Sequence, residues 1–331
     1  MSKMDKESLR IGILGTGFGK THARLLAALP NVEVVGIAGR NEQKTRETAC
    51  SLGIQGYTDS QELIDRPDIQ ALVVCYPTKL HAEYVMAALN AGKHVFCETP
   101  VAYSLTDAEQ MSRAARSSGK LLLVALFGRF MSDYRYIHEY IDAGRLGVPK
   151  AVFANRRTPP IWGNGWNENF IIDLMLHDID YLYWVFGQPA AVTSRGLGSS
   201  SAGWNHVSID CEFDDMWAAI EGCGIMPASF PFSTSLRVVG DEGAIDLNWY
   251  WAGTYPISEI KFYPQKGEPE ILSVPGYDPY EAECRYFVDC VQGKAGPDLL
   301  SIDSACSSLR IALAAKQSLE SNGRRITIKN K

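Results

Sequence analysis

Short apolar runs alternate with helical stretches in the first part of the chain. Each run is nearly continuous in Val, Ile, Leu and Ala, which is typical of parallel strands covered on both faces. The runs occupy residues 9–14, 32–38, 71–76, 94–98 and 121–126. Between them, helical stretches occupy residues 20–29, 42–51, 81–91 and 104–118. This repetition predicts an α/β fold with a doubly wound parallel sheet.

Two local signals support the helix boundaries. Ser104 stands three residues before Asp107, the spacing of a helix N-cap. Pro67 follows a short helical stretch at 60–66, and proline ends a helix because it lacks an N–H group.

The pattern changes after about residue 128. Helical segments at 132–143 and 167–186 flank a strand at 150–157, and residues 190–274 then form short alternating runs separated by Gly, Asp and Pro. Alternation of this kind indicates a mixed or antiparallel sheet. Two more helices are expected at 278–292 and 303–320. We predict a first domain at 1–127 and a second at 128–331, whose last helices are free to pack back on the first.

Composition and charge narrow the class of protein. The 331 residues are 46% hydrophobic and carry a net charge of −6, without the basic footprint of a nucleic-acid-binding protein. The longest apolar runs are far shorter than the roughly 20 residues that span a bilayer. The polar start lacks the apolar core of a signal peptide, so we expect a soluble, cytoplasmic protein with no nucleic-acid or membrane partner.

Eight cysteines are spread along the chain without a C-x-x-C pair or a Cys/His spacing typical of zinc sites. Several lie in apolar runs, where a free cysteine acts as a small hydrophobic residue. The expectation is reduced, buried thiols and no metal site.

The stretch GTGFGKT at 15–21 fits two phosphate-binding loops imperfectly. As a P-loop it lacks its leading glycine, since residue 14 is leucine, and no predicted strand ends in the aspartate that holds magnesium. As a dinucleotide loop it has Gly15 for a tight turn and Gly17 for close approach to phosphate, with Lys20 in place of the last small residue. Gly19 can serve the close strand–helix approach instead. The surrounding strand and helix favour the dinucleotide interpretation.

The second strand ends in Gly39 and Arg40 instead of an acidic residue. A carboxylate there would bind the ribose 2′-hydroxyl of NAD, whereas an arginine pairs with a 2′-phosphate. The sequence therefore favours NADP over NAD. The alternative is that Arg40 is a solvated loop residue.

Residues 170–186 are apolar nearly all round and include Asp173 and His177 four residues apart. A carboxylate beside an imidazole can orient a general base, and His177 could accept a hydroxyl proton as hydride leaves the carbon. A structural Asp–His hydrogen bond in the core is the alternative.

The chain resembles the glucose-fructose oxidoreductase/inositol dehydrogenase family, also called Gfo/Idh/MocA. The resemblance covers the glycine loop, the segment from Cys75 to Pro100, "FGRF", "DLMLHDID", "LRVVGDEGAIDL" and the last helices. It implies an N-terminal Rossmann domain and a C-terminal α/β domain with a large open sheet that forms homodimers or homotetramers. The implied activity is NAD(P)-linked oxidation or reduction of a sugar, cyclitol or sugar derivative.

The resemblance also implies site residues. Asp173 and His177 match the family's catalytic pair, and Arg156 or Arg157 could recognise an anionic substrate group. The implied substrate contacts are Arg156, Trp162, Asp173 and His177. The implied cofactor contacts are Gly15, Thr16, Gly17, Phe18, Gly19, Arg40, Tyr76, Pro77, Thr78, His81, Glu98, Thr99 and Arg129.

One departure concerns the family's Glu-Lys-Pro motif, which is Glu98-Thr99-Pro100 here. The missing ammonium would stabilise developing alkoxide charge, a contact worth about 3–4 kcal/mol. Some relatives, including biliverdin reductases, resemble family members that lack this lysine and still transfer hydride. The pocket helix also lacks the glycine run that often precedes the family's aspartate.

Three functions remain open at this point. The leading one is an NADP-preferring dehydrogenase or reductase of a sugar or polyol. The others are a non-catalytic sensor that binds cofactor and ligand, and a lyase or hydrolase that retains the cofactor for transient oxidation.

Overall fold

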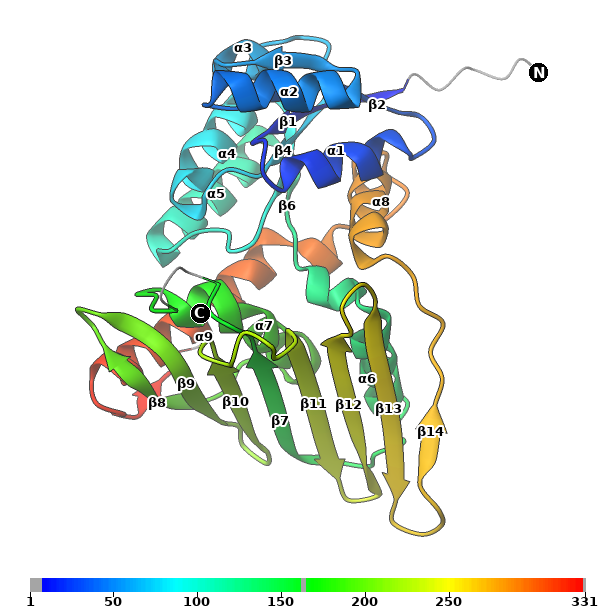
Figure 1. The fold of residues 1–331 in the computed structure, drawn as a ribbon, viewed down its shortest axis with the longest axis vertical. Helices are drawn as coiled ribbons and strands as arrows, with labels where there is room; N and C mark the ends of the chain where they lie inside the picture. The colour runs from blue at the N-terminus through cyan, green and yellow to red at the C-terminus, as the bar shows by residue number, and fades with distance from the viewer. Residues whose placement is uncertain (1–7, 162–164, 330–331) are drawn as a thin grey trace. The chain divides into compact units, whose positions relative to one another are not determined.

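The computed structural model describes residues 8–161 and 165–329, which form two compact units (Figure 1). One unit contains the residues up to Phe127 together with Asp278–Cys306. The other contains Gly128–Tyr277 together with the residues from Ser307 onward. The chain thus leaves the first unit once and returns to it for one helix and the start of the next.

The first unit is built on a six-stranded sheet with the order β3-β2-β1-β4-β5-β6, and all of its pairings are parallel. Its strands are β1 (Leu9–Leu14), β2 (Val32–Ala38), β3 (Gln55–Tyr57), β4 (Ala71–Val74), β5 (His94–Cys97) and β6 (Leu122–Val124). Ile11 and Val73 are fully buried, as expected for strands covered on both faces. The strand order reverses between β1 and β4, so the predicted doubly wound parallel sheet is confirmed.

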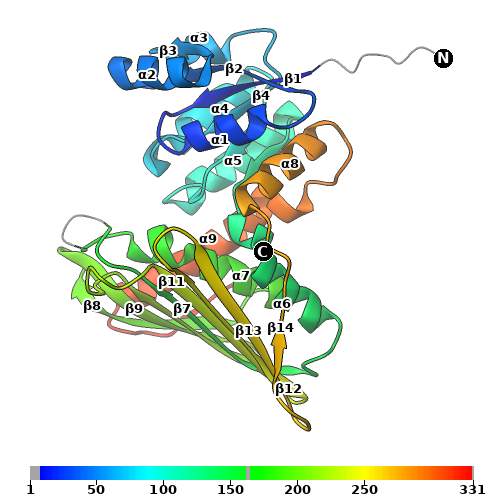
Figure 2. The ribbon, with the colours of Figure 1, turned by 45° about the vertical axis from the view of Figure 1, so that its right-hand side comes forward.

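Helices cover both faces of this sheet, with α1 and α2 on one face and α4 and α5 on the other (Figures 1 and 2). The helices are α1 (Gly19–Ala27), α2 (Glu42–Leu52), α3 (Ser60–Ile64), α4 (His81–Asn90), α5 (Leu105–Ser118) and α8 (Pro279–Val291). Short 3₁₀ turns are η1 (Thr78–Leu80), η2 (Phe127–Phe130) and η4 (Asp298–Leu300). The predicted cap is confirmed, because Ser104 Oγ accepts the Asp107 N–H at 3.1 Å.

The second unit contains a nine-stranded mixed sheet with the order β14-β13-β12-β11-β7-β10-β9-β8-β15. Its central strand β7 pairs parallel with β10 and antiparallel with β11, which confirms the predicted mixed sheet. The strands are β7 (Pro149–Arg157), β8 (Ala191–Ser199), β9 (Gly203–Glu212), β10 (Trp217–Cys223), β11 (Ser233–Gly240), β12 (Gly243–Trp251), β13 (Pro256–Pro264), β14 (Glu270–Leu272) and β15 (Ile326–Thr327).

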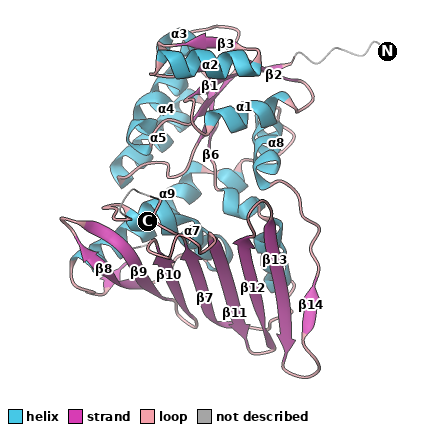
Figure 3. Ribbon diagram, viewed as in Figure 1, coloured by secondary structure: helices cyan, strands magenta, loops and turns pink. Residues whose placement is uncertain are grey.

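The helices α6 (Ser132–Asp142) and α7 (Leu176–Phe186) pack against one face of this sheet (Figure 3). The opposite face carries Phe153 of β7 and Trp217 of β10, which are 37% and 40% exposed with ring centroids 5.5 Å apart. Tyr263 of β13 is also exposed. Period-two alternation explains this, since the neighbours of Phe153 in β7 are buried.

The predicted helix at 167–186 begins later than expected. A π-helical turn, η3 (Ile171–Met175), precedes α7. The last helix of the described residues is α9 (Ile302–Glu320). Asn167 is held out of the helix because its backbone N–H donates to the Trp204 carbonyl and its carbonyl accepts the Trp204 N–H. Tertiary pairing therefore overrides the helical pattern at this point.

Within the described ranges, no helix combines the length and apolar character needed to cross a bilayer.

Candidate functional site

The glycine loop follows β1 at the carboxyl edge of the first sheet. Gly15 has φ = 115°, and a Cβ at this position would lie 2.5 Å from the Cys75 carbonyl oxygen. A Cβ on Gly19 would lie 2.8 Å from Ile13 Cγ2, whereas one on Gly17 would meet nothing within 4 Å. Only glycine fits at residues 15 and 19, so the loop lies tight on the sheet and keeps open space at Gly17.

Helix α1 begins directly after this loop. No side chain caps its N-terminus at Phe18, and no acidic residue lies in its first turn. Free N–H groups and the positive end of the helix dipole favour a phosphate here. Lys20 lies within the first turn of α1, as the sequence suggested. The residues present therefore fit the pyrophosphate of a dinucleotide.

Arg40 lies at the carboxyl end of β2 and is exposed. The loop around it is ordered by neighbours, since Thr45 Oγ1 donates to the Gly39 and Asn41 carbonyls at 3.1 and 2.8 Å. Asn41 Oδ1 accepts the Lys44 N–H and caps α2. Within the described part of the chain, no hydrogen bond or ion pair engages the Arg40 guanidinium, which leaves it available to a ligand anion.

His81 is buried and joins two loops of the first unit. Its Nδ1 lies 2.9 Å from the Pro100 carbonyl oxygen and its Nε2 lies 2.6 Å from the Tyr76 carbonyl oxygen. Burial lowers the pKa of His81, while the two carbonyl acceptors favour its protonated form. Tyr76 is buried, with its hydroxyl 2.7 Å from Ser60 Oγ, whereas Pro77 is exposed and Thr78 is half-buried. We interpret His81 as a residue that positions these loops.

Glu98 follows β5 and is held on both of its oxygens. Oε1 lies 2.5 Å from His22 Nε2, and Oε2 accepts the Thr99 N–H at 3.1 Å. His22 is fully buried, and its Nδ1 lies 3.2 Å from Cys284 Sγ. Sequence reasoning missed His22 and Cys284, because they come from helices far from Glu98 in the chain and match no spacing rule.

In the second unit, Asp173 lies in the π-helical turn and His177 lies in the first turn of α7. Asp173 Oδ2 accepts a hydrogen bond from Asn167 Nδ2 at 2.8 Å. Lys316 Nζ donates to Asn169 Oδ1 at 2.9 Å. π-helical turns are frequent at functional sites. Asn167, Asn169 and Lys316 were missed by the sequence reasoning, although two of them stand just before the predicted pair.

The environment of His177 keeps its ring neutral. Burial and then the positive charge of Arg156 lower the pKa of His177 to about 3. A neutral imidazole has a free lone pair for a hydrogen bond at neutral pH, whereas a pKa of about 3 makes it a weak base.

Three predicted arginines are engaged by carboxylates within the second unit. Arg156 donates from Nε and Nη2 to Asp178 at 2.7 and 3.1 Å, and both side chains are buried. Arg129 is paired in the same way with Asp180 and lies over the Trp184 ring. Arg157 pairs with Glu221 at 2.5 Å. These pairs neutralise the charges that the sequence assigned to substrate or cofactor, so these roles stay predictions. Trp162 lies outside the described residues.

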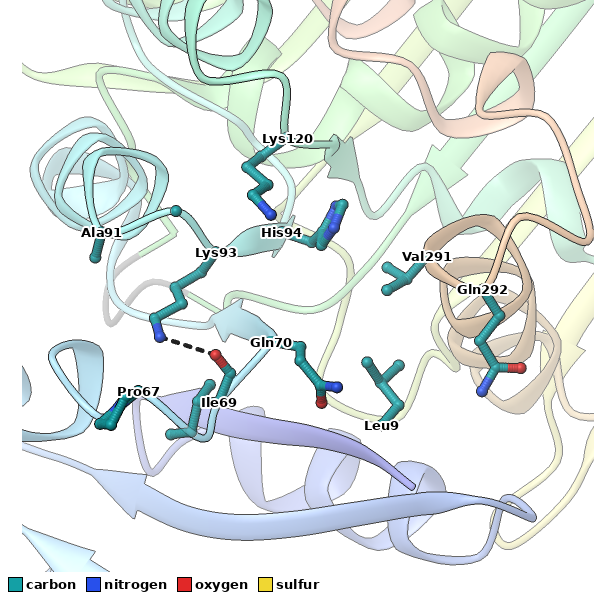
Figure 4. A pocket seen from close by; sticks show the side chains of 11 residues that line it. Leu9, Pro67, Ile69, Gln70, Ala91, Lys93, His94, Lys120, Val291 and Gln292 are labelled. Carbon is teal, nitrogen blue, oxygen red and sulfur yellow. Dashed lines mark hydrogen bonds between the residues drawn. The ribbon is translucent and has the colours of Figure 1, made fainter. Parts of the chain in front are cut away.

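A cavity of about 590 Å³ lies at the amino edge of the first sheet (Figure 4). Lys93, His94, Lys120 and Gln292 line it, and Lys93 Nζ donates to the Ile69 carbonyl. Lys93 and Lys120 follow the C-termini of α4 and α5, where cations complement the helix dipole. Ligands of doubly wound sheets bind at the carboxyl edge, so this cavity is separate from the glycine loop.

All eight cysteines are free, and six of them are buried. This agrees with the thiols expected from the sequence.

Two family models match the chain. The oxidoreductase family with an NAD-binding Rossmann fold matches residues 9–126, and the GFO/IDH/MocA C-terminal domain matches residues 134–246. The first match agrees with the dinucleotide interpretation of the glycine loop and not with the P-loop interpretation.

Individual proteins are similar over different lengths. Myo-inositol 2-dehydrogenase of Thermotoga maritima is 30% identical over 54% of this chain and 55% of its own length. The chain thus aligns with about half of that relative. Uncharacterized oxidoreductase YrbE of Bacillus subtilis is 26% identical over 93% of both chains. An oxidoreductase from Agrobacterium radiobacter, solved with NAD+, L-tartaric acid and magnesium, has a TM-score of 0.84 at 18% identity, over 97% of this chain and 98% of its own.

Proposed function

Because the chain belongs to the GFO/IDH/MocA oxidoreductase family, we propose that it transfers hydride between a nicotinamide cofactor and a sugar, cyclitol or related polyol. The observation that carries this proposal is the glycine loop, which is open at Gly17 and leads into an uncapped α1. That arrangement suits a pyrophosphate. The similarity to an inositol dehydrogenase supports the substrate class.

His177 and Asp173 take the proton work in this proposal. When bound, the nicotinamide ring supplies the hydride acceptor for alcohol oxidation. His177 accepts the hydroxyl proton as the carbon loses its hydride, so the substrate becomes a carbonyl compound and the imidazole becomes an imidazolium. Asp173 stabilises that positive charge electrostatically. The lowered pKa of His177 leaves its ring unprotonated before the reaction, although the same shift weakens the ring as a base.

Arg40 makes NADP the proposed cofactor. Its exposed guanidinium, without an ion-pair partner in the described part of the chain, suits a 2′-phosphate. A carboxylate at the same point would favour NAD instead.

The second candidate function is a cofactor- and ligand-binding sensor, and Thr99 favours it. Thr99 can donate one neutral hydrogen bond but supplies no charge to an alkoxide. We nevertheless favour the enzyme over the sensor, because the family resemblance includes relatives that lack this lysine and still transfer hydride.

Single-turnover absorbance at the reduced-nicotinamide band, with a panel of inositols and sugars, tests the proposal. Turnover that is lost in His177→Ala, while cofactor affinity is retained, supports the enzyme. Tight cofactor binding without turnover on any substrate supports the sensor.

We also propose that the exposed face of the second sheet joins copies of this chain into a homo-oligomer. Phe153, Trp217 and Tyr263 place large rings on that face, and Arg237 pairs there with Asp246. Exposed aromatic groups of this kind are typical of interfaces. Light scattering of the wild-type protein should give a molecular mass that is a multiple of the 36.5 kDa chain mass. The Phe153→Lys variant should give a lower molecular mass. A monomeric wild-type protein would contradict this.

A further inference from the structure

Three different donor groups lie close together next to the glycine loop of the first unit. One donor atom each from His22, Cys75 and Glu98 lies within 4.8 Å of the other two. His22 belongs to α1, Cys75 follows β4 and Glu98 follows β5. The set contains an imidazole, a thiol and a carboxylate, which together suit a borderline-soft divalent cation such as Zn²⁺.

The surroundings of the three donors resemble those of a bound metal. His22 is fully buried, and its Nδ1 contacts Cys284 Sγ at 3.2 Å. A metal-binding histidine generally donates its second ring N–H to a carboxylate, carbonyl or water, and the Cys284 sulfur takes that place here. Glu98 is 18% exposed, so the group is reachable from solvent on one side.

A second observation comes from Glu283 on α8. Its side chain is fully buried, and neither carboxylate oxygen has a hydrogen-bond partner among the described residues. It precedes Cys284 and lies close enough for its charge to act on Cys75 and Glu98. A buried carboxylate without a partner costs several kcal/mol unless it holds a proton or faces a cation.

We propose that His22, Cys75 and Glu98 bind a divalent transition-metal ion of the zinc type, with the buried carboxyl group of Glu283 as an outer partner. Zinc bonds of about 2.0–2.3 Å place tetrahedral donors about 3.2–3.8 Å apart. The His22–Glu98 contact at 2.5 Å therefore opens, and the most distant donor moves inward by about 1 Å.

The metal site includes Glu98, which the family resemblance also places in contact with the cofactor, so metal binding is tested apart from hydride transfer. All of its residues lie in the first unit, and its test needs neither cofactor nor substrate. The spacing rules miss it because residues 22, 75 and 98 are brought together by one helix and the ends of two strands and not by one short motif.

Cobalt substitution tests the proposal on the full, cofactor-free chain. Co²⁺ should produce a thiolate charge-transfer band and tetrahedral d–d bands, and Zn²⁺ should displace both. Cys75→Ser should abolish the charge-transfer band, whereas the control Cys211→Ser, a buried cysteine of the second unit, should keep it. A band that survives Cys75→Ser, or no band in wild-type protein, overturns the proposal.

Glu283→Gln separates the charge of Glu283 from its packing. The change conserves shape, and circular dichroism checks folding. Competition with a chromophoric chelator should show Zn²⁺ affinity falling by about tenfold or more, as for other outer-sphere partners. Unchanged affinity would contradict the assignment of Glu283.

Discussion

Replacing Arg40 by alanine should shift the cofactor preference of this protein from NADP toward NAD. Arg40 is exposed at the carboxyl end of β2, and within the described residues no hydrogen bond or ion pair occupies its guanidinium. The change therefore removes a ligand contact without leaving a carboxylate unpaired. The fold around it depends on Thr45 and Asn41, which stay in place.

The expected magnitude follows from the exposure of Arg40. A hydrogen bond to a charged group contributes about 1.5–3 kcal/mol. Solvent screening at an exposed position favours the lower end, about 1.5–2 kcal/mol. Since about 1.4 kcal/mol is a factor of ten, NADPH affinity should fall by about 10–30-fold. NADH lacks the 2′-phosphate, so its affinity should change little.

Fluorescence titration of NADPH and NADH measures both dissociation constants. Arg46→Ala is the matched control, because Arg46 is an exposed arginine of α2 and its loss changes the net charge equally. The reasoning is wrong if wild-type protein binds NADH more tightly, or if Arg40→Ala weakens both cofactors alike. An equal effect of Arg46→Ala would assign the preference to overall charge.

The remaining predictions concern proton transfer, charge and stability. Thr99→Lys should raise the single-turnover rate if the missing ammonium limits hydride transfer, and an unchanged or lower rate counts against that account. Because the pKa of His177 is lowered to about 3, its ring stays neutral from pH 7 down to 5, and kcat/KM for alcohol oxidation should lack a break near 6.5. Its depressed pKa also makes stability fall as pH drops below about 6.5, where the unfolded state binds the proton that the folded state excludes; urea unfolding measures this against His177→Ala. Asp180→Asn leaves the Arg129 guanidinium buried without its carboxylate and should lower the free energy of unfolding by about 3–5 kcal/mol. Asp246→Asn, whose partner Arg237 is 57% exposed, should cost under about 1 kcal/mol. Equal losses in urea unfolding would show that burial does not govern these pairs.

The sequence predicted the fold well where local patterns and tertiary packing agree. The strands of the first sheet are continuous apolar runs because helices cover both faces, so their composition reveals them directly. The helix start at 167 was wrong because pairing between Asn167 and Trp204 overrides local pattern.

The candidate site was less accessible to sequence reasoning. Glycine spacing and Arg40 carry a local signal, whereas the contacts of Glu98 with His22 and of His22 with Cys284 depend on three elements far apart in the chain. Arg129 and Arg156 looked available to ligands, but the structure pairs each with a buried carboxylate. A single sequence does not specify which acid reaches which arginine.

The central claim is hydride transfer by the nicotinamide cofactor with His177 as proton acceptor. The most direct test follows deuterium from the carbinol carbon of a turned-over polyol in a stopped-flow reaction. We predict deuterium at C4 of the reduced nicotinamide and a primary isotope effect on the rate at which its absorbance appears. We also predict that His177→Ala loses this absorbance change. Deuterium recovered in water, or bound cofactor that no polyol reduces, would contradict it.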